Sequence, residues 1–112
     1  MAGDWIKIEH VTPDKPEVYR MARVLGITAE EVVGRLLRIW IWADQQSQNG
    51  HAVGVTKKDI NDISRRDKFA EAMCEVGWLV GDDGELTFPN FERHNSETSK
   101  LRALATKRKQ KL

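Results

Sequence analysis

The sequence of 112 residues contains a single cysteine, three prolines and no apolar run of transmembrane length. Cys74 has no second cysteine in the chain with which to form a disulfide bond, and this favours a reducing compartment. Crossing a bilayer takes ~20 consecutive apolar residues, and the N-terminal sequence MAGDWIKIEH lacks the charged and then apolar regions of a signal peptide. We therefore expect a soluble, cytoplasmic protein with no membrane partner.

Sequence motifs for metal, cofactor and nucleotide chemistry are also missing. His10, His51 and His94 are far apart, and the CxxC and HExxH spacings of metal sites do not occur. The segment GDDG (81–84) lacks the spacing of a calcium loop, and neither GxGxxG nor a Walker loop is present. Cys74 lies on an expected helix and is better explained as a small core residue. We therefore expect neither enzymatic activity nor a cofactor.

Charges of the two signs are distributed unevenly, although the net charge is only +1. Residues 93–112 contain seven of the 18 basic residues and one of the 17 acidic residues, so this segment carries about +6 and residues 1–92 about −5. Such asymmetry indicates a negatively charged partner for the basic segment, and a solvated chain end is the alternative. We expect one domain over residues 1–92, followed by a basic C-terminal helix or tail over residues 93–112.

Apolar side chains at helical spacing, polar caps and glycine stops predict a mainly helical domain. Thr28 and Glu31 have the spacing of a capping box, in which each side chain accepts a hydrogen bond from the backbone N–H of the other residue. Thr56 can cap a later helix, with Asp59 in its first turn near the positive helix end. The expected helices cover about residues 17–25, 29–48, 57–66, 67–76 and 96 onward.

Short β-branched and apolar runs predict the strands. Residues 5–10 (WIKIEH) alternate well enough for an N-terminal strand, and residues 52–55 predict a second one. The pair Asp83-Gly84, between the apolar runs 78–80 and 86–88, predicts a tight hairpin. The order helix, strand, helix, helix and hairpin is that of a winged helix-turn-helix, here with an extra N-terminal strand and helix and a C-terminal basic helix.

The surfaces that a winged helix usually offers to DNA are acidic in this sequence. Asp82, Asp83 and Glu85 lie at the hairpin tip, and the second helix of the expected helix-turn-helix spans residues 67–76. The residues expected on the outer face of that helix are Lys68, Glu71, Ala72 and Glu75. Since phosphates repel carboxylates, we expect this helix to pack against the rest of the domain and to keep the protein soluble through its charged face. We expect the hairpin tip to be a structural turn or a contact with a basic protein.

Basic residues instead gather near the short helix at 57–66 and in the C-terminal segment. The start of that short helix also offers backbone N–H groups that attract phosphate. If the C-terminal helix folded alongside it, the two would form one continuous positive strip. The candidate DNA-binding residues are Lys57, Lys58, Arg65, Arg66, Lys68, Arg93, Asn95, Lys100, Arg102, Lys107, Arg108, Lys109 and Lys111. Among these, Asn95 is about as well explained as a helix cap.

The long helix at 29–48 is apolar at every position from 36 to 43 except Arg38. Trp40 and Trp42 are two residues apart, so they point to nearly opposite sides. Such a helix is either central to the fold or half covered by a partner. We favour the central position because one small core must serve every element. The alternative is a protein-interaction module in which Trp40 and Trp42 drive self-association or docking to another protein.

Several short segments of the chain resemble one known family. They are WIK (5–7), VGRL (33–36), IW (39–40), VGWL (76–79), PNFERHN (89–95) and KLRA (100–103). In these segments, from about Trp5 to Arg102, the chain resembles the N-terminal winged-helix domain of phage and prophage replication proteins, of the initiator or helicase-loader kind. Such proteins usually continue into a second domain, so we expect a fragment or a short stand-alone version.

The resemblance implies a role in DNA replication inside a bacterial host cell. The implied partners are duplex or partly opened DNA, a second copy of the chain, and a replicative helicase or its loader. A transcriptional regulator is the alternative on fold grounds, because a fold does not fix a function.

Overall fold

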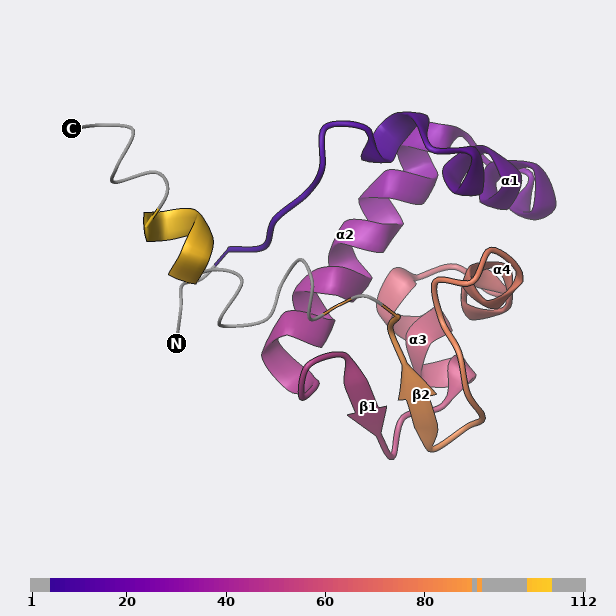
Figure 1. Cartoon of the computed structure of the whole chain (residues 1–112). Helices are drawn as coiled ribbons and strands as arrows, with labels where there is room; N and C mark the ends of the chain where they lie inside the picture. Colours follow the sequence, from indigo (N-terminus) through magenta and orange to yellow (C-terminus); the bar gives the residue numbers. More distant parts are fainter. Residues whose placement is uncertain (1–4, 90, 92–100, 106–112) are drawn as a thin grey trace.

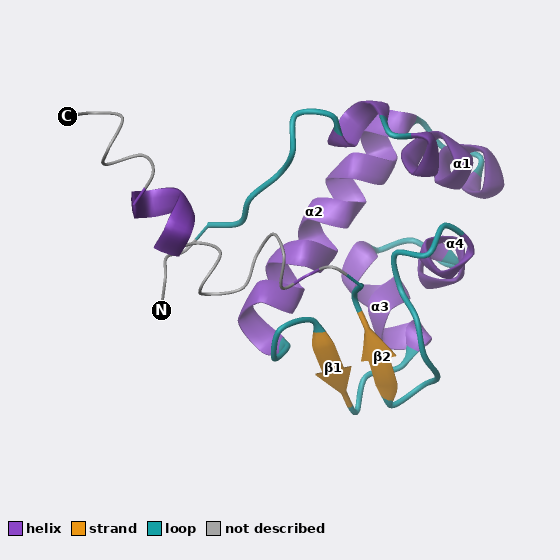
Figure 2. Ribbon diagram, in the orientation of Figure 1, coloured by secondary structure: helices purple, strands orange, loops and turns teal. Residues whose placement is uncertain are grey.

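The computed structural model describes residues 5–89, 91 and 101–105, and these form a mainly helical protein with a small antiparallel sheet (Figures 1 and 2). The elements are η1 (Thr12–Asp14), α1 (Pro16–Leu25), α2 (Ala29–Gln46), β1 (His51–Val53), α3 (Lys57–Ser64), α4 (Phe69–Glu75) and β2 (Glu85–Thr87). Residues 101–105 are helical as well. Within the described part of the chain, no helix is both long and apolar enough to cross a membrane.

The first two helices begin and end close to their predicted caps. Gly26, in the left-handed conformation with φ 67°, ends α1. At the start of α2 the Thr28 hydroxyl accepts a hydrogen bond from the Glu31 backbone N–H, 3.1 Å away. The predicted capping box is incomplete, because the Glu31 carboxylate pairs with Arg35 one turn later, with 2.8 Å between Nη2 and Oε2. Thr28 therefore caps α2 without the reciprocal bond.

α3 carries a complete capping box. The Thr56 hydroxyl accepts from the Asp59 N–H at 3.2 Å, and the Thr56 N–H donates to the Asp59 carboxylate at 3.0 Å. α4 begins later than predicted because Lys68 adopts the left-handed conformation, with φ 68°, just before it. The side chain of Asn61 on α3 accepts a hydrogen bond of 2.7 Å from Ala70 N–H and so holds the first turn of α4. The two short helices are therefore locked together.

The sheet is smaller than the sequence predicts. β1 pairs antiparallel with β2, with Ala52 opposite Leu86. Val80 bridges Thr87 through two backbone hydrogen bonds of 2.9 Å, so the first arm of the predicted hairpin is reduced to one bridge. β2 thus has β1 on one side and Val80 on the other. Gly81 turns the chain with φ 102°, where an added Cβ would clash with the carbonyl oxygen of residue 85.

The N-terminal strand predicted over residues 5–10 is wrong. Residues 5–9 have no regular secondary structure, and the segment runs toward α1 along the first half of α2, whereas the sheet follows the other end of α2 (Figure 1). A strand needs a hydrogen-bonding edge beside it. β2 pairs with β1 and Val80, and β1 pairs with β2 and, at His51, with Gln48, so Ile6 and Ile8 have no strand partner among the described residues.

The core lies around α2, in agreement with the predicted central position of this helix. Its buried stripe is Val32, Leu36, Ile39 and Ala43, and it packs against both α1 and α3. The largest fully buried side chains elsewhere are Met21, Ile60, Phe69, Met73, Leu79 and Leu86. Every described helix and strand contributes to this single cluster, apart from the short η1 turn and residues 101–105.

Candidate nucleic-acid interface

The turn between α3 and α4 carries several of the predicted basic residues. Arg65 ends α3 in the left-handed conformation with φ 61°, and its N–H donates to the Asp62 carbonyl at 3.2 Å. Lys68 occupies the same region of φ/ψ space three residues later. The side chains of Arg65 and Lys68 are exposed. The backbone therefore fixes a tight turn from which these two cations point into solvent.

Arg66, in the same turn, points the other way. Its Nη2 donates to the Leu25 carbonyl at the end of α1, 2.7 Å away, and its Nε is buried without a hydrogen-bond partner among the described residues. A cation is favoured at a helix C-terminus because it offsets the negative end of the helix dipole. Arg66 is therefore a structural residue that joins α1 to the α3–α4 turn, and we withdraw it from the predicted DNA-binding set.

Two arginines of α2 close the C-terminal end of α3. Arg35 Nη1 donates to the carbonyls of Ser64 at 2.6 Å and Arg65 at 2.9 Å, and Arg38 Nε donates to the Ile63 carbonyl at 3.2 Å. The last carbonyls of a helix have no partners within the helix, so these bonds satisfy them. The sequence prediction missed this role. Its one signal was Arg38, the only charged residue within an otherwise apolar run.

The N-terminal end of α3 is closed by a carboxylate from the hairpin tip. Asp83 Oδ1 accepts a hydrogen bond of 2.8 Å from the Lys57 backbone N–H, and Asp59 is held by the capping box. Asp83 thus occupies the Lys57 N–H and the Thr56 hydroxyl occupies the Asp59 N–H, which leaves fewer N–H groups at this helix start for the phosphate that the sequence predicts there. The acidic tip is also explained in part, since Asp83 stabilises α3 and is turned toward the protein.

The lysines at this helix start differ in exposure. Lys57 is half-buried, whereas the side chain of Lys58 is 83% exposed. Lys58 forms an ion pair of 3.0 Å with Asp62, one turn later on α3, and this pair raises the pKa of the lysine. An exposed pair of this kind is weak and exchanges readily for another anion. Lys58 therefore keeps a cation on the surface of α3.

α4, which corresponds to the second helix of the helix-turn-helix expected from the sequence, is largely buried. Phe69, Ala70, Ala72 and Met73 are all in the core, and the expectation that Ala72 faces outward is wrong. Phe69 fixes the rotation of the helix, because a ring of that size cannot be exposed without losing a large buried area. Glu75 is exposed on this helix, so α4 offers an acid and no basic side chain to a groove.

The described C-terminal residues contribute one predicted cation. Arg102 is exposed in the helical segment 101–105. This segment lies far from α3 in Figure 1, so the described residues do not form the continuous strip that the sequence predicts. The other predicted residues of this region, Arg93, Asn95, Lys100, Lys107, Arg108, Lys109 and Lys111, lie outside the described residues.

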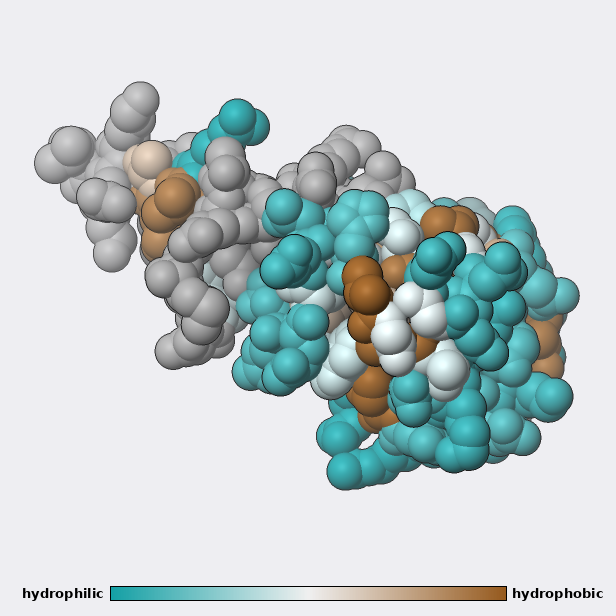
Figure 3. Space-filling model, turned by 90° about the horizontal axis from the view of Figure 1, so that it is seen from below, coloured by the Kyte–Doolittle hydropathy of each residue, from teal (hydrophilic) through white to brown (hydrophobic). Residues whose placement is uncertain are grey.

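Trp40 and Trp42 occupy different concave sites, as their spacing predicts. Trp40 packs against Trp78, with 6.0 Å between ring centroids and 53° between ring planes. Trp42 lies with Ile63 in an open groove of about 370 Å³ between α2 and α3, next to Ile41, which is 47% exposed. On the face seen from below, hydrophilic side chains surround a narrow apolar strip (Figure 3). That face therefore lacks the broad apolar patch of an obligate interface.

No group of three His, Cys, Asp or Glu side chains in the described part of the chain could hold a metal ion. Cys74 is half-buried, and burial raises the pKa of its thiol, which keeps it in the unreactive protonated form. Comparisons of the chain with protein-family models, curated proteins and solved structures found no match. A functional proposal therefore rests on geometry and charge.

Proposed function

We propose that this chain is a winged-helix, DNA-binding module of a phage or prophage replication protein. The order α2, β1, α3, α4, Val80 and β2 supports the fold, because a winged helix has the same sequence of elements. The pairing supports it too, since β2 lies between β1 and the Val80 bridge and thus closes a small wing. The segments of this chain that resemble phage and prophage replication proteins support a role in DNA replication.

One observation carries the DNA-binding part of the proposal. Four charged residues of the described body are bonded to helix ends: Arg35, Arg38 and Arg66 to carbonyls, and Asp83 to an N–H group. Residues 93–112, by contrast, carry about +6. Neutralising phosphates with lysine and arginine releases condensed counterions, which is the main source of sequence-independent affinity for DNA. We infer that the C-terminal segment is the main DNA anchor.

Three exposed cations of the body extend this anchor. They are Lys58, Arg65 and Lys68, with the half-buried Lys57 beside Lys58, while the exposed Arg102 belongs to the C-terminal segment itself. α4 and the hairpin tip contact DNA little, because α4 is packed and the tip is acidic. We therefore expect binding that tolerates many sequences, holds duplex or partly opened DNA, and weakens steeply with salt.

Fluorescence anisotropy with a labelled duplex, repeated over a series of salt concentrations, tests this proposal. The variant carries Lys107→Ala, Arg108→Ala, Lys109→Ala and Lys111→Ala. We expect weaker binding to every sequence and a salt slope flattened by roughly 0.9 per lost phosphate contact. The matched control is the double variant Arg20→Ala and Arg23→Ala, which removes two exposed cations from α1. Equal affinity and slope for wild type and the fourfold variant would overturn the proposal.

A second candidate function is protein interaction, with a second copy of the chain or a replicative helicase or its loader as partner. The exposed Ile41 beside the Trp42 groove favours it. Light scattering with and without a short duplex separates the two. A dimer that ignores DNA supports the interaction module, and a monomer that changes mass with DNA supports the DNA-binding module. In the first case Ile41→Asp should give monomers.

A further inference from the structure

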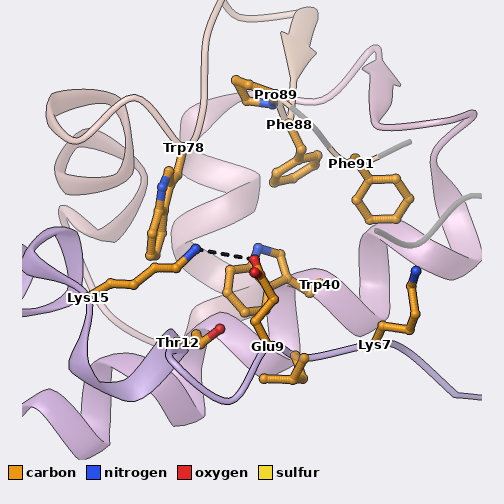
Figure 4. A pocket seen from close by; sticks show the side chains of 10 residues that line it. Lys7, Glu9, Thr12, Lys15, Trp40, Trp78, Phe88, Pro89 and Phe91 are labelled. Carbon is orange, nitrogen blue, oxygen red and sulfur yellow. Dashed lines mark hydrogen bonds and ion pairs between the residues drawn. The ribbon is translucent and has the colours of Figure 1, made fainter. Parts of the chain in front are cut away.

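A second concave site lies between the N-terminal segment, α2 and the chain that follows β2. This pocket has a volume of about 130 Å³. Its walls are aromatic: Trp40 from α2, Trp78 after α4, and Phe88 and Phe91 after β2. Trp78 and Phe91 stand on opposite sides of the pocket, with Trp40 and Phe88 between them (Figure 4). Three segments that are distant in the sequence thus supply one aromatic enclosure.

The size of the pocket limits what can enter. An apolar cavity of about 150 Å³ takes a benzene molecule, so this pocket accepts one planar ring system and excludes a helix. The ring pairs in its wall are tilted: 53° between Trp40 and Trp78, and 48° between Phe88 and Phe91. Trp40 and Trp78 are half-buried, so part of their ring surface stays open to a further stacked ring, whereas Phe88 and Phe91 belong to the core.

Backbone contacts hold the two phenylalanine walls in place. The Gly50 carbonyl accepts a hydrogen bond of 2.8 Å from the Phe88 N–H. Gly50 has φ 89°, and a Cβ added to it would lie 2.7 Å from the Cβ of Phe91. The close approach at Gly50 therefore fixes Phe88 and Phe91 against the start of β1, so this side of the pocket is formed before any ligand arrives.

Charged side chains surround the mouth. Lys15 Nζ lies 3.4 Å from Glu9 Oε1 and 5.9 Å from the centre of the Trp78 ring, and Lys7 also lines the pocket (Figure 4). The ammonium groups of Lys7 and Lys15 thus lie beside the aromatic walls, where a ligand that joins a planar ring to an anion can contact them. The Glu9 carboxylate and the Thr12 hydroxyl, both in the lining, are positioned to bond the polar edge of such a ring.

We propose that this pocket binds one unpaired base of single-stranded DNA, with the base against the aromatic walls and its phosphate near Lys7 and Lys15. The inference rests on the proposed function and deepens it, because it assigns partly opened DNA as the ligand of a second, tail-independent contact. Bases within a duplex are stacked and paired, so they reach such a pocket only after being flipped out. An aromatic side chain of a partner protein has the ring but not the anion, and it fits this mouth less well.

Quenching of tryptophan fluorescence reads out the contact directly, because a base stacked on Trp40 or Trp78 quenches its emission. The full chain is titrated with an unlabelled single strand of about 15 nucleotides and with the matching duplex. The variants are Trp78→Leu, which removes one wall, and Lys15→Gln, which removes one cation of the mouth. The matched controls are Trp42→Leu and Arg23→Gln, which change a tryptophan and an exposed cation outside the pocket and outside the proposed DNA-binding residues.

We expect saturable quenching by the single strand that survives Trp42→Leu. Trp78→Leu should weaken single-strand binding by about 5- to 150-fold, the usual effect of removing one stacking partner, and leave duplex binding unchanged. Lys15→Gln, at a partly exposed site where folding is little affected, should weaken the same step several-fold. Circular dichroism checks that each variant is folded. If Trp78→Leu is unfolded, Lys15→Gln still tests the inference.

Different results would contradict the proposed function and the pocket inference. If the chain binds no DNA of either form, the proposed function fails. If it binds DNA through the C-terminal segment while Trp78→Leu and Lys15→Gln bind single strands as wild type does, the pocket inference alone is overturned. A saturable response to N-acetylphenylalaninamide, without any response to the single strand, would also overturn it and indicate a protein partner.

Discussion

The two ends of α3 are closed by side chains of opposite charge that come from different parts of the chain. Asp83, from the hairpin tip, bonds the first turn, whereas Arg35 and Arg38, from α2, bond the last carbonyls. Each sign matches the partial charge of the helix end it contacts. The comparison shows that charges from distant parts of the sequence serve in the folded body to hold one short helix.

This helix depends on such contacts because it is only eight residues long. Isolated helices shorter than ~12 residues are marginal in water. Capping by neighbouring segments therefore stabilises α3 and also fixes its position against α2 and the sheet. Breaking one end at a time measures how much each contributes.

We expect the largest effect at the C-terminal end, from Arg35→Met. The change removes two hydrogen bonds to the last carbonyls of α3 and the ion pair with Glu31. Since the Ser64 carbonyl belongs to a fully buried residue, we expect a loss of about 2 kcal/mol in the free energy of unfolding. Urea denaturation measures it, with Arg20→Met, on the exposed side of α1, as control. Equal stability of the two variants would contradict the capping role.

A smaller effect is expected at the N-terminal end, from Asp83→Ala. The change frees the Lys57 N–H, and loss of a comparable helix cap costs about 1 kcal/mol. Asp82→Ala removes the neighbouring acid of the same exposed tip and should have little effect in the same urea titration. If Asp82→Ala destabilises as much as Asp83→Ala, the tip acts through its total charge and not through this contact.

We expect the smallest effect from Asp59, in the capping box at the N-terminal end of α3, and pH reveals it. Hydrogen bonds from the Thr56 backbone and hydroxyl lower the pKa of Asp59 below its usual 3.8. A lowered folded-state pKa adds stability above the unfolded-state value, and this is lost as pH falls through the folded-state value. Asp59→Asn should therefore reduce the difference in stability between pH 7 and about pH 3, measured by thermal unfolding. If Asp59→Asn leaves the difference in stability between the two pH values unchanged, the ionised Asp59 carboxylate does not stabilise the fold.

Local signals in the sequence were sufficient for most elements. Thr28, Thr56 and Gly26 predicted helix ends that are confirmed, because caps act within one turn. The strand predicted over 5–10 failed because alternation cannot show whether a sheet edge is free. The sheet itself needs β1 to meet a segment more than thirty residues later, and only the second arm of the predicted hairpin became a full strand.

The roles of the charged residues could not be predicted in the same way. Asp83 bonds Lys57, and Arg66 bonds Leu25, across sequence separations of 26 and 41 residues. Nothing in the local pattern shows such partners, so an acid in a turn and an arginine after a helix both look solvent-exposed. The aromatic pocket was missed for the same reason: Trp40 was expected to be either core or interface, and its neighbours arrive from three other segments.

The pocket has a consequence for synthesis of the protein. Lys7 and Glu9 belong to the first part of the described chain to leave the ribosome, and Phe88 and Phe91 are among the last of the folded body. Helices α1 to α4 can pair while translation continues, since domains form as their segments become available. The aromatic enclosure cannot be complete until residue 91 has emerged. A nascent chain therefore lacks the complete pocket until that residue has been added.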